Sequence, residues 1–255
     1  MATKRSTNTS AATYSENLLT TKEKQGRSNN TLRLRLDDLK TFDPLTDNQR
    51  DFFNAYKRGD YFVALHGVAG TGKTFIALYK ALEEVLDKSN PFNKIIIVRS
   101  AVQSREIGHL PGDVSEKMEI YQQPYRQICE TFFGRKDAWD RLEEQGHIEF
   151  ISTSFIRGMS FDDAIIIVDE IQNMNFEEID TVMTRVGYRS KIIWCGDYRQ
   201  TDLRKAGDKT GILKFFDIAA KMQAFTRIEF TADDIVRSSL VKDYILAKLD
   251  YEDNI

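Results

Sequence analysis

Several residue types and patterns are scarce in this chain, and each scarcity excludes a class of protein. Its two cysteines and three histidines have no metal-ligand spacing, so the sequence predicts neither a disulfide framework nor a zinc site. No uninterrupted apolar run exceeds that at Ala164–Val168, whereas a membrane-spanning helix needs about 18 apolar residues. The formal net charge of -3 excludes a strongly basic, histone-like nucleic-acid binder, but it does not exclude a local basic patch.

The first 31 residues are poor in large apolar side chains, with almost none before Leu18. Basic residues outnumber acidic ones there, so residues 1–31 are predicted to form a flexible, mildly basic tail before a folded domain over 32–255. A basic arm that touches RNA is an alternative role for this tail. No apolar segment typical of a secretory signal follows the basic residues. Cys129 and Cys195 are therefore expected as free thiols in a cytoplasmic protein.

Strand-like and helix-like patterns alternate along the rest of the chain. Strands are expected at 32–36, 61–66, 94–99, 147–152, 163–168, 191–195 and 227–231. Helices are expected from a cap at Thr46 through Tyr56, and at 73–86, 116–133, 136–144, 176–186 and 240–249. Continuous Ile/Val strands that alternate with helices predict an α/β fold, a mostly parallel sheet with helices on both faces.

The strongest motif fits the phosphate-binding pattern G-x-x-x-x-G-K-[ST] at every fixed position. It follows a predicted strand and opens a predicted helix, the arrangement in which backbone N–H groups bind phosphate. Its Lys73 is predicted to reach the β- and γ-phosphates of ATP, and the Thr74 hydroxyl to bind Mg²⁺. The motif consists of Gly67, Val68, Ala69, Gly70, Thr71, Gly72, Lys73 and Thr74.

Two further apolar strands end in polar groups. Asp169 and Glu170 follow Ile165–Val168, and ligands of open α/β sheets lie beyond such strand ends. Asp169 is predicted to hold Mg²⁺ and Glu170 to polarise the attacking water. The second strand ends in Gly196-Asp197-Tyr198-Arg199-Gln200, where Gln200 is a candidate for the γ-phosphate or the water. From that segment alone, a polar turn is an equally good interpretation.

Together these motifs resemble the ATPase domain of PhoH-like proteins, a P-loop family related to superfamily 1 helicases. The resemblance covers about Leu45 to Leu249, and its most diagnostic parts are Leu110-Pro111-Gly112-Asp113 and Asp169-Glu170-Ile171-Gln172-Asn173. The fold that it implies is a single RecA/helicase-like P-loop NTPase domain. The chain departs from the family around Gln103-Ser104-Arg105-Glu106, where Arg105 adds a positive charge.

The resemblance also implies roles for residues outside the motifs. Gln49 matches the glutamine with which helicase-like ATPases bind adenine. With no second helicase domain expected, a transition-state arginine must come from this domain or from a neighbouring subunit, and Arg237 and Arg185 are the candidates. A homo-oligomer is expected, with a hexameric ring favoured, in a bacterial cell or encoded by a phage.

The leading functional hypothesis is a Mg²⁺-dependent ATPase coupled to single-stranded RNA or DNA, with RNA favoured and helicase activity left open. Its candidate nucleic-acid contacts are Arg99, Gln103, Arg105 and His109, although a structural lid over the nucleotide is an alternative role for that loop. A nucleotide-switched assembly or adaptor ATPase is the second hypothesis. A small-molecule kinase is the third, and Asp169-Glu170 followed by Gln200 favours hydrolysis by water over it.

Overall fold

A six-stranded sheet forms the centre of the molecule in the computed structural model, which describes residues 33–100, 114–197 and 206–253. Every strand pair is parallel, and the strand order is β3-β2-β4-β5-β1-β6. The strands are β1 (Phe62–Gly67), β2 (Lys94–Arg99), β3 (Ile148–Ser152), β4 (Ala164–Asp169), β5 (Lys191–Gly196) and β6 (Phe225–Phe230).

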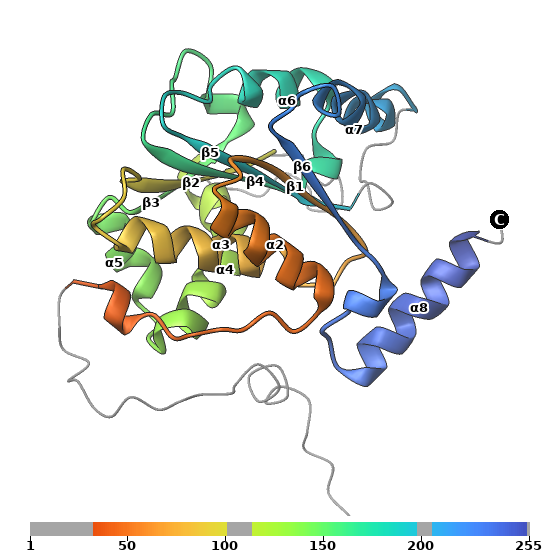
Figure 1. Ribbon diagram of the computed structural model, residues 1–255, viewed down its shortest axis with the longest axis horizontal. Helices are drawn as coiled ribbons and strands as arrows, with labels where there is room; N and C mark the ends of the chain where they lie inside the picture. The colour runs from red at the N-terminus through yellow and green to blue at the C-terminus, as the bar shows by residue number, and fades with distance from the viewer. Residues whose placement is uncertain (1–32, 101–113, 198–205, 254–255) are drawn as a thin grey trace, which may run out of the picture.

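Helices cover both faces of this sheet (Figure 1). One layer contains α2 (Asp47–Arg58), α3 (Lys73–Leu86), α4 (Val114–Phe133) and α5 (Ala138–Glu144), and the other contains α6 (Phe176–Met183) and α7 (Ala206–Ala219). Four short 3-10 helices complete the described elements: η1 (Leu36–Asp38), η2 (Thr153–Phe155), η3 (Ile171–Asn173) and η4 (Ala232–Asp234). The last helix, α8 (Ser239–Asp253), projects away from both layers.

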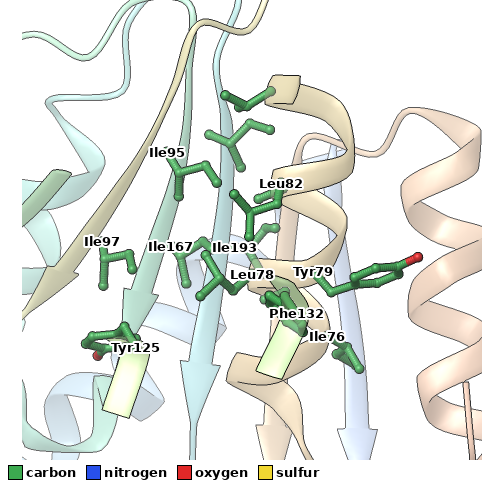
Figure 2. Close-up of a cluster of buried hydrophobic side chains, with 14 of the residues drawn as sticks. Ile76, Leu78, Tyr79, Leu82, Ile95, Ile97, Tyr125, Phe132, Ile167 and Ile193 are labelled. Carbon is green, nitrogen blue, oxygen red and sulfur yellow. The ribbon is translucent and has the colours of Figure 1, made fainter. Parts of the chain in front are cut away.

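Alternate residues of the central strands supply two separate cores. Ile95 and Ile97 of β2 pack toward α3, whereas Ile96 and Val98 pack toward α6 and α7. Figure 2 shows the first core, in which Leu78 and Leu82 of α3 face the isoleucines of the sheet. Both faces of these strands are buried, which explains why the sequence has continuous Ile/Val runs instead of an apolar–polar alternation. The predicted α/β class, with a parallel sheet between two helical layers, is confirmed.

The strand predicted at 32–36 is wrong for the residues that the structure describes. Leu34 is buried, but Leu36 is partly exposed and begins η1. The Asp38 carboxylate accepts the Arg35 N–H, and this local cap replaces the backbone pairing that a strand would need. The alternating leucines therefore do not mark a strand; Leu34 is the buried one, and the segment around it is irregular.

Helix α7 had no counterpart in the sequence prediction. Gly211 lies inside it, and glycine is a poor helix former. A Cβ at Gly211 would lie 2.8 Å from the backbone nitrogen of Phe176, the first residue of α6. The glycine that weakens the helix signal therefore allows α6 and α7 to approach closely. In the described part of the chain, no helix is long and apolar enough to cross a membrane.

Candidate active site

The glycine-rich motif forms the turn between β1 and α3. A Cβ at Gly67 would lie 2.1 Å from the backbone oxygen of Phe230 in the neighbouring strand β6, so only glycine fits there. Gly72 has φ +80° and is the N-cap of α3, where its left-handed backbone turns the chain into the helix. The loop thus places the N-terminus of α3 toward the carboxyl edge of the sheet, as anion binding requires.

Lys73 lies buried beneath this loop, with 8% of its surface exposed. Its ammonium donates to the carbonyl oxygens of Gly67 at 2.9 Å and Val68 at 2.7 Å. Burial lowers the pKa of Lys73, and nearby carboxylates, Asp197 foremost, oppose that shift. The ammonium is therefore held by dipoles inside the loop, next to the place where phosphate would lie.

The Thr74 hydroxyl and the Asp169 carboxylate meet at the floor of the site. Thr74 Oγ1 donates to Asp169 Oδ1 at 2.7 Å, although the two residues lie far apart in the sequence. Oxygen donors of this kind suit Mg²⁺, which usually keeps several waters and takes further oxygens from substrate phosphates. Among the described residues, no cluster of three His, Cys, Asp or Glu side chains could hold a metal ion.

Glu170 follows Asp169 in a left-handed backbone conformation, with φ +55°. Burial, and then the adjacent Asp169 carboxylate, raise the pKa of Glu170, while Arg99 and a hydrogen bond from Gln172 lower it. The Gln172 amide nitrogen donates to Glu170 Oε2, and its oxygen accepts the Asp197 N–H at 3.0 Å. Gln172 therefore fixes Glu170 relative to the end of β5.

Strand β5 lies between β1 and β4, so its end separates the phosphate-binding loop from the carboxylate pair. This explains why the third motif of the sequence belongs to the same site. Asp197 is buried there, and a Cβ at Gly196 would lie 2.3 Å from Gln172 Oε1. Gln200, the residue predicted to contact the γ-phosphate, lies outside the described residues.

These groups surround one cleft of about 530 Å³. Its wall includes the loop residues Ala69, Gly70, Gly72, Lys73 and Thr74, the acidic residues Asp169, Glu170 and Asp197, and Phe75, Pro124, Gln127, Ile128, Thr131, Gln172, Gly196 and Arg237. A volume of this size lies within the range of pockets that hold a nucleotide-sized ligand.

Gln49 lies beside the loop with its side-chain amide already bonded at both ends. Its oxygen accepts the Leu45 N–H at 2.8 Å, and its nitrogen donates to the Thr71 carbonyl at 2.9 Å. Gln49 is buried, with 3% of its surface exposed, and its predicted contact with adenine stays a prediction. A small pocket lined by Phe42, Phe75 and Val236 adjoins Gln49.

The two candidate transition-state arginines occupy different places. Arg237 lines the cleft, and its Cγ would lie 3.0 Å from a Cβ at Gly70. Arg185 lies at the opposite edge of the sheet, where its backbone oxygen accepts the N–H of Phe161 just before β4 begins. Among the described residues, Arg185 is therefore not part of the cleft lining.

Arg99 is half-buried at the end of β2. Its guanidinium lies over the Tyr121 ring, 5.5 Å from the centroid. Burial alone would lower the pKa of Arg99, but Tyr125, Asp169 and Glu170 raise it. The structure thus places Arg99 beside the carboxylate pair, and its predicted contact with nucleic acid stays a prediction. The other predicted contacts, Gln103, Arg105 and His109, lie outside the described residues.

Comparison with known proteins places the chain in a family. The family model for PhoH-like proteins matches residues 41–248. The chain belongs to the PhoH-like family. It is 37% identical over 203 residues to a PhoH-like protein of Bacillus subtilis, which covers 79% of this chain and 62% of the relative. A PhoH-like protein of Mycobacterium leprae is 33% identical over 218 residues, with 84% and 60% covered.

The chain thus spans about three fifths of the length of these PhoH-like relatives. Among solved structures, the large terminase of a thermophilic bacteriophage is similar over 79% of this chain and 50% of its own, at 14% identity and a TM-score of 0.45. Unliganded Pif1 from Bacteroides is similar over 72% and 41%, at 13% identity and a TM-score of 0.36. Family membership and site geometry together support a P-loop NTPase fold for this chain.

Two residues of the site were missed by motif reasoning. Tyr125 comes from α4 and reaches Asp169 across the fold, and no local pattern marks it. Gln172 is part of the stretch that identifies the family, but its contacts to Glu170 and Asp197 follow only from the three-dimensional structure.

Proposed function

We propose that this chain binds ATP with Mg²⁺ and hydrolyses it. The observation that supports this most strongly is the convergence of Lys73, the Thr74–Asp169 pair and Glu170 on one cleft. Lys73 would turn from the loop carbonyls to the β- and γ-phosphates and neutralise their charge. Thr74 and Asp169 would hold the ion, which supplies charge stabilisation when it is bound.

Glu170 is the proposed base for the attacking water. A carboxylate with a raised pKa is a better proton acceptor near neutral pH than an ordinary glutamate. Gln172 would keep that carboxylate oriented, and Gln200 remains the candidate from the third sequence motif for contact with the γ-phosphate or the water. Arg237 is the proposed arginine over the γ-phosphate from within the chain, a role worth about 10³- to 10⁵-fold in rate in related chemistry.

The decisive test is ATP hydrolysis by the purified protein. We expect Lys73→Ala to lose ATP binding or turnover, and Glu170→Gln to keep ATP bound while its hydrolysis falls by at least about 10²-fold. Glu143→Gln, which changes a glutamate of α5 away from the cleft, is the matched control. Normal hydrolysis by Glu170→Gln would refute the assignment of the base.

We also propose that hydrolysis is coupled to single-stranded nucleic acid, most favourably RNA. The proposed contacts are Arg99, Gln103, Arg105 and His109, and the positive charges of Arg99 and Arg105 are their main support in the sequence. Single-stranded RNA and DNA should each be added to the ATPase assay over a range of salt concentrations. Stimulation that weakens with salt and is lost in Arg105→Ala supports coupling. No stimulation by either polymer favours the nucleotide-switched adaptor.

One structural observation favours that second candidate function. None of the α8 residues from Ser239 to Tyr251 is buried, and Leu240, Tyr244 and Tyr251 are exposed by 69% or more. The same helix contacts the nucleotide loop, because Ile245 Cδ1 would lie 3.3 Å from a Cβ at Gly70. A helix that joins the loop to an open apolar surface suits a protein that reports its nucleotide state to a partner.

A homo-oligomer, with a hexameric ring favoured, completes the proposal. Arg185 faces away from its own cleft, so its candidate role requires a neighbouring subunit placed head to tail. Mixing Arg185→Ala protein with Glu170→Gln protein should restore part of the activity. Some interfaces in the mixture would join an intact Arg185 from one variant to an intact Glu170 from the other. Sedimentation of the wild-type protein provides the mass. A fully active monomer at every concentration would refute the ring.

A further inference from the structure

Tyr125 of α4 is a buried tyrosine whose hydroxyl lies at the carboxyl edge of the sheet. Its Oη donates to Asp169 Oδ2 at 2.8 Å. The ring packs against Trp139 and Phe150, with centroids 6.3 Å and 5.7 Å away. The aromatic ring of Tyr125 therefore makes the packing contacts, and its hydroxyl alone makes the hydrogen bond to Asp169.

Asp169 is held from two sides by this arrangement. Oδ1 accepts from Thr74 at the start of α3, and Oδ2 accepts from Tyr125 in the middle of α4. Two donors from different elements fix the rotation of the carboxylate about its Cβ–Cγ bond. Oδ1, the oxygen shared with Thr74, is thereby kept toward the cleft.

The Tyr125 hydroxyl is the donor in this hydrogen bond, because a carboxylate oxygen can only accept. Positive charge also lies beside this carboxylate, because Arg99 at the end of β2 is the register partner of Asp169 at the end of β4.

We propose that Tyr125 is a positioning residue, which orients the Asp169 carboxylate to accept a divalent cation bound to a nucleoside triphosphate. This inference rests on the proposed function, because it assigns Tyr125 to the ion that accompanies ATP. Tyr125, which lies outside the sequence motifs, thus becomes a hydrogen-bond partner of the ion-binding carboxylate. Outer partners of this kind typically contribute about 10- to 100-fold to metal affinity or activity.

The test is the Mg²⁺ dependence of ATP binding in Tyr125→Phe, measured by calorimetry in Mg²⁺ and in EDTA. We expect the affinity in EDTA to be unchanged within about two-fold, and the gain in affinity from Mg²⁺ to fall by about ten-fold or more. The Mg²⁺ concentration for half-maximal hydrolysis should rise in parallel. A purely structural tyrosine would change both affinities together.

The matched control is Tyr56→Phe. Tyr56 is also buried and lies beneath the Lys191 ammonium, 4.2 Å from its ring centroid, at the amino end of β5. Removal of the Tyr56 hydroxyl should leave the Mg²⁺ dependence of ATP binding unchanged. If Tyr125→Phe shows the wild-type gain from Mg²⁺, the positioning role is refuted while ATP binding stands. If the wild-type protein binds no ATP, the proposed function fails as well.

A second measurement keeps the inference testable if Tyr125→Phe does not fold. Incorporation of 3-fluorotyrosine at position 125 retains both ring and hydroxyl and adds a single ¹⁹F signal. We expect Mg²⁺ with ATP to shift that signal in the wild-type background and to shift it far less in Asp169→Asn. Equal shifts in the two backgrounds would overturn the proposal.

Discussion

Single residues at the carboxyl edge of the sheet have pKa values that their neighbours displace in opposite directions. Burial lowers the pKa of Lys73 and raises that of Glu170, because it disfavours the charged form of both groups. Each is partly restored by the other's charge. Displaced pKa values of this kind cluster at functional sites, although structural ion pairs produce them too.

The first residue-scale prediction concerns Gln172. Its amide donates to the charged form of Glu170 and so lowers the pKa of that carboxyl. Gln172→Met should raise this pKa further. Because the base must be deprotonated, the acid limb of the kcat profile should move to higher pH, with activity at low pH reduced severalfold. Gln145→Met, which changes the residue at the C-terminal end of α5, is the control. An acid limb at the wild-type pH would contradict the assignment.

The sequence identified some site residues and missed others for a physical reason. Lys73, Thr74, Asp169 and Glu170 belong to short motifs whose spacing reflects the local turn from a strand into a helix or loop. Tyr125 acts through a hydrogen bond to a residue on another element, so its role depends on how α4 packs. The position of Arg99 beside Asp169 was likewise not predictable, because a strand end in the sequence does not show which strand lies next to it.

At the scale of elements, long periodic segments were predictable and segments shaped by close contact were not. The predicted helix over 73–86 and the predicted strand over 94–99 match α3 and β2 residue for residue. In contrast, α7 contains a glycine that serves its packing against α6. The alternating leucines near η1 have a strand period but no partner strand in the described sheet.

Gly211→Ala tests the contact between α6 and α7. Helix propensity alone would make alanine about 1 kcal/mol more stable than glycine. The added Cβ would meet the Phe176 nitrogen at 2.8 Å, and such overpacking costs about 1–3 kcal/mol. We expect a net loss of about 1 kcal/mol in the free energy of unfolding by urea titration. A more stable variant would show that the two helices separate readily.

The stability of the whole molecule should depend on pH through His66. This side chain is buried at the end of β1, where Arg227 Nε donates to its Nε2 at 2.6 Å. Burial, followed by the charges of Arg227 and Lys73, lowers the pKa of His66 from 6.5 to about 4. Between pH 6.5 and about 4, His66 is therefore protonated in the unfolded chain and neutral in the folded chain.

The sign of the effect follows from that difference. Stability linked to His66 is present above pH 6.5 and is lost as the pH falls toward 4. The melting temperature of the wild-type protein should fall more steeply over this interval than that of His66→Gln, measured by calorimetry at matched ionic strength. Parallel curves for the two proteins would mean that His66 is protonated in the folded state.

The contact of α8 with the nucleotide loop has a consequence for the whole molecule. Arg237 and Ile245 both lie against Gly70, so the base of the projecting helix and the ligand cleft share one wall. If ATP alters that wall, it alters the helix, and thermodynamic reciprocity makes the reverse equally true. Any partner that binds α8 more tightly in one nucleotide state must change the affinity for ATP by the same factor. Binding of that partner to α8 would then control how tightly the cleft holds the nucleotide.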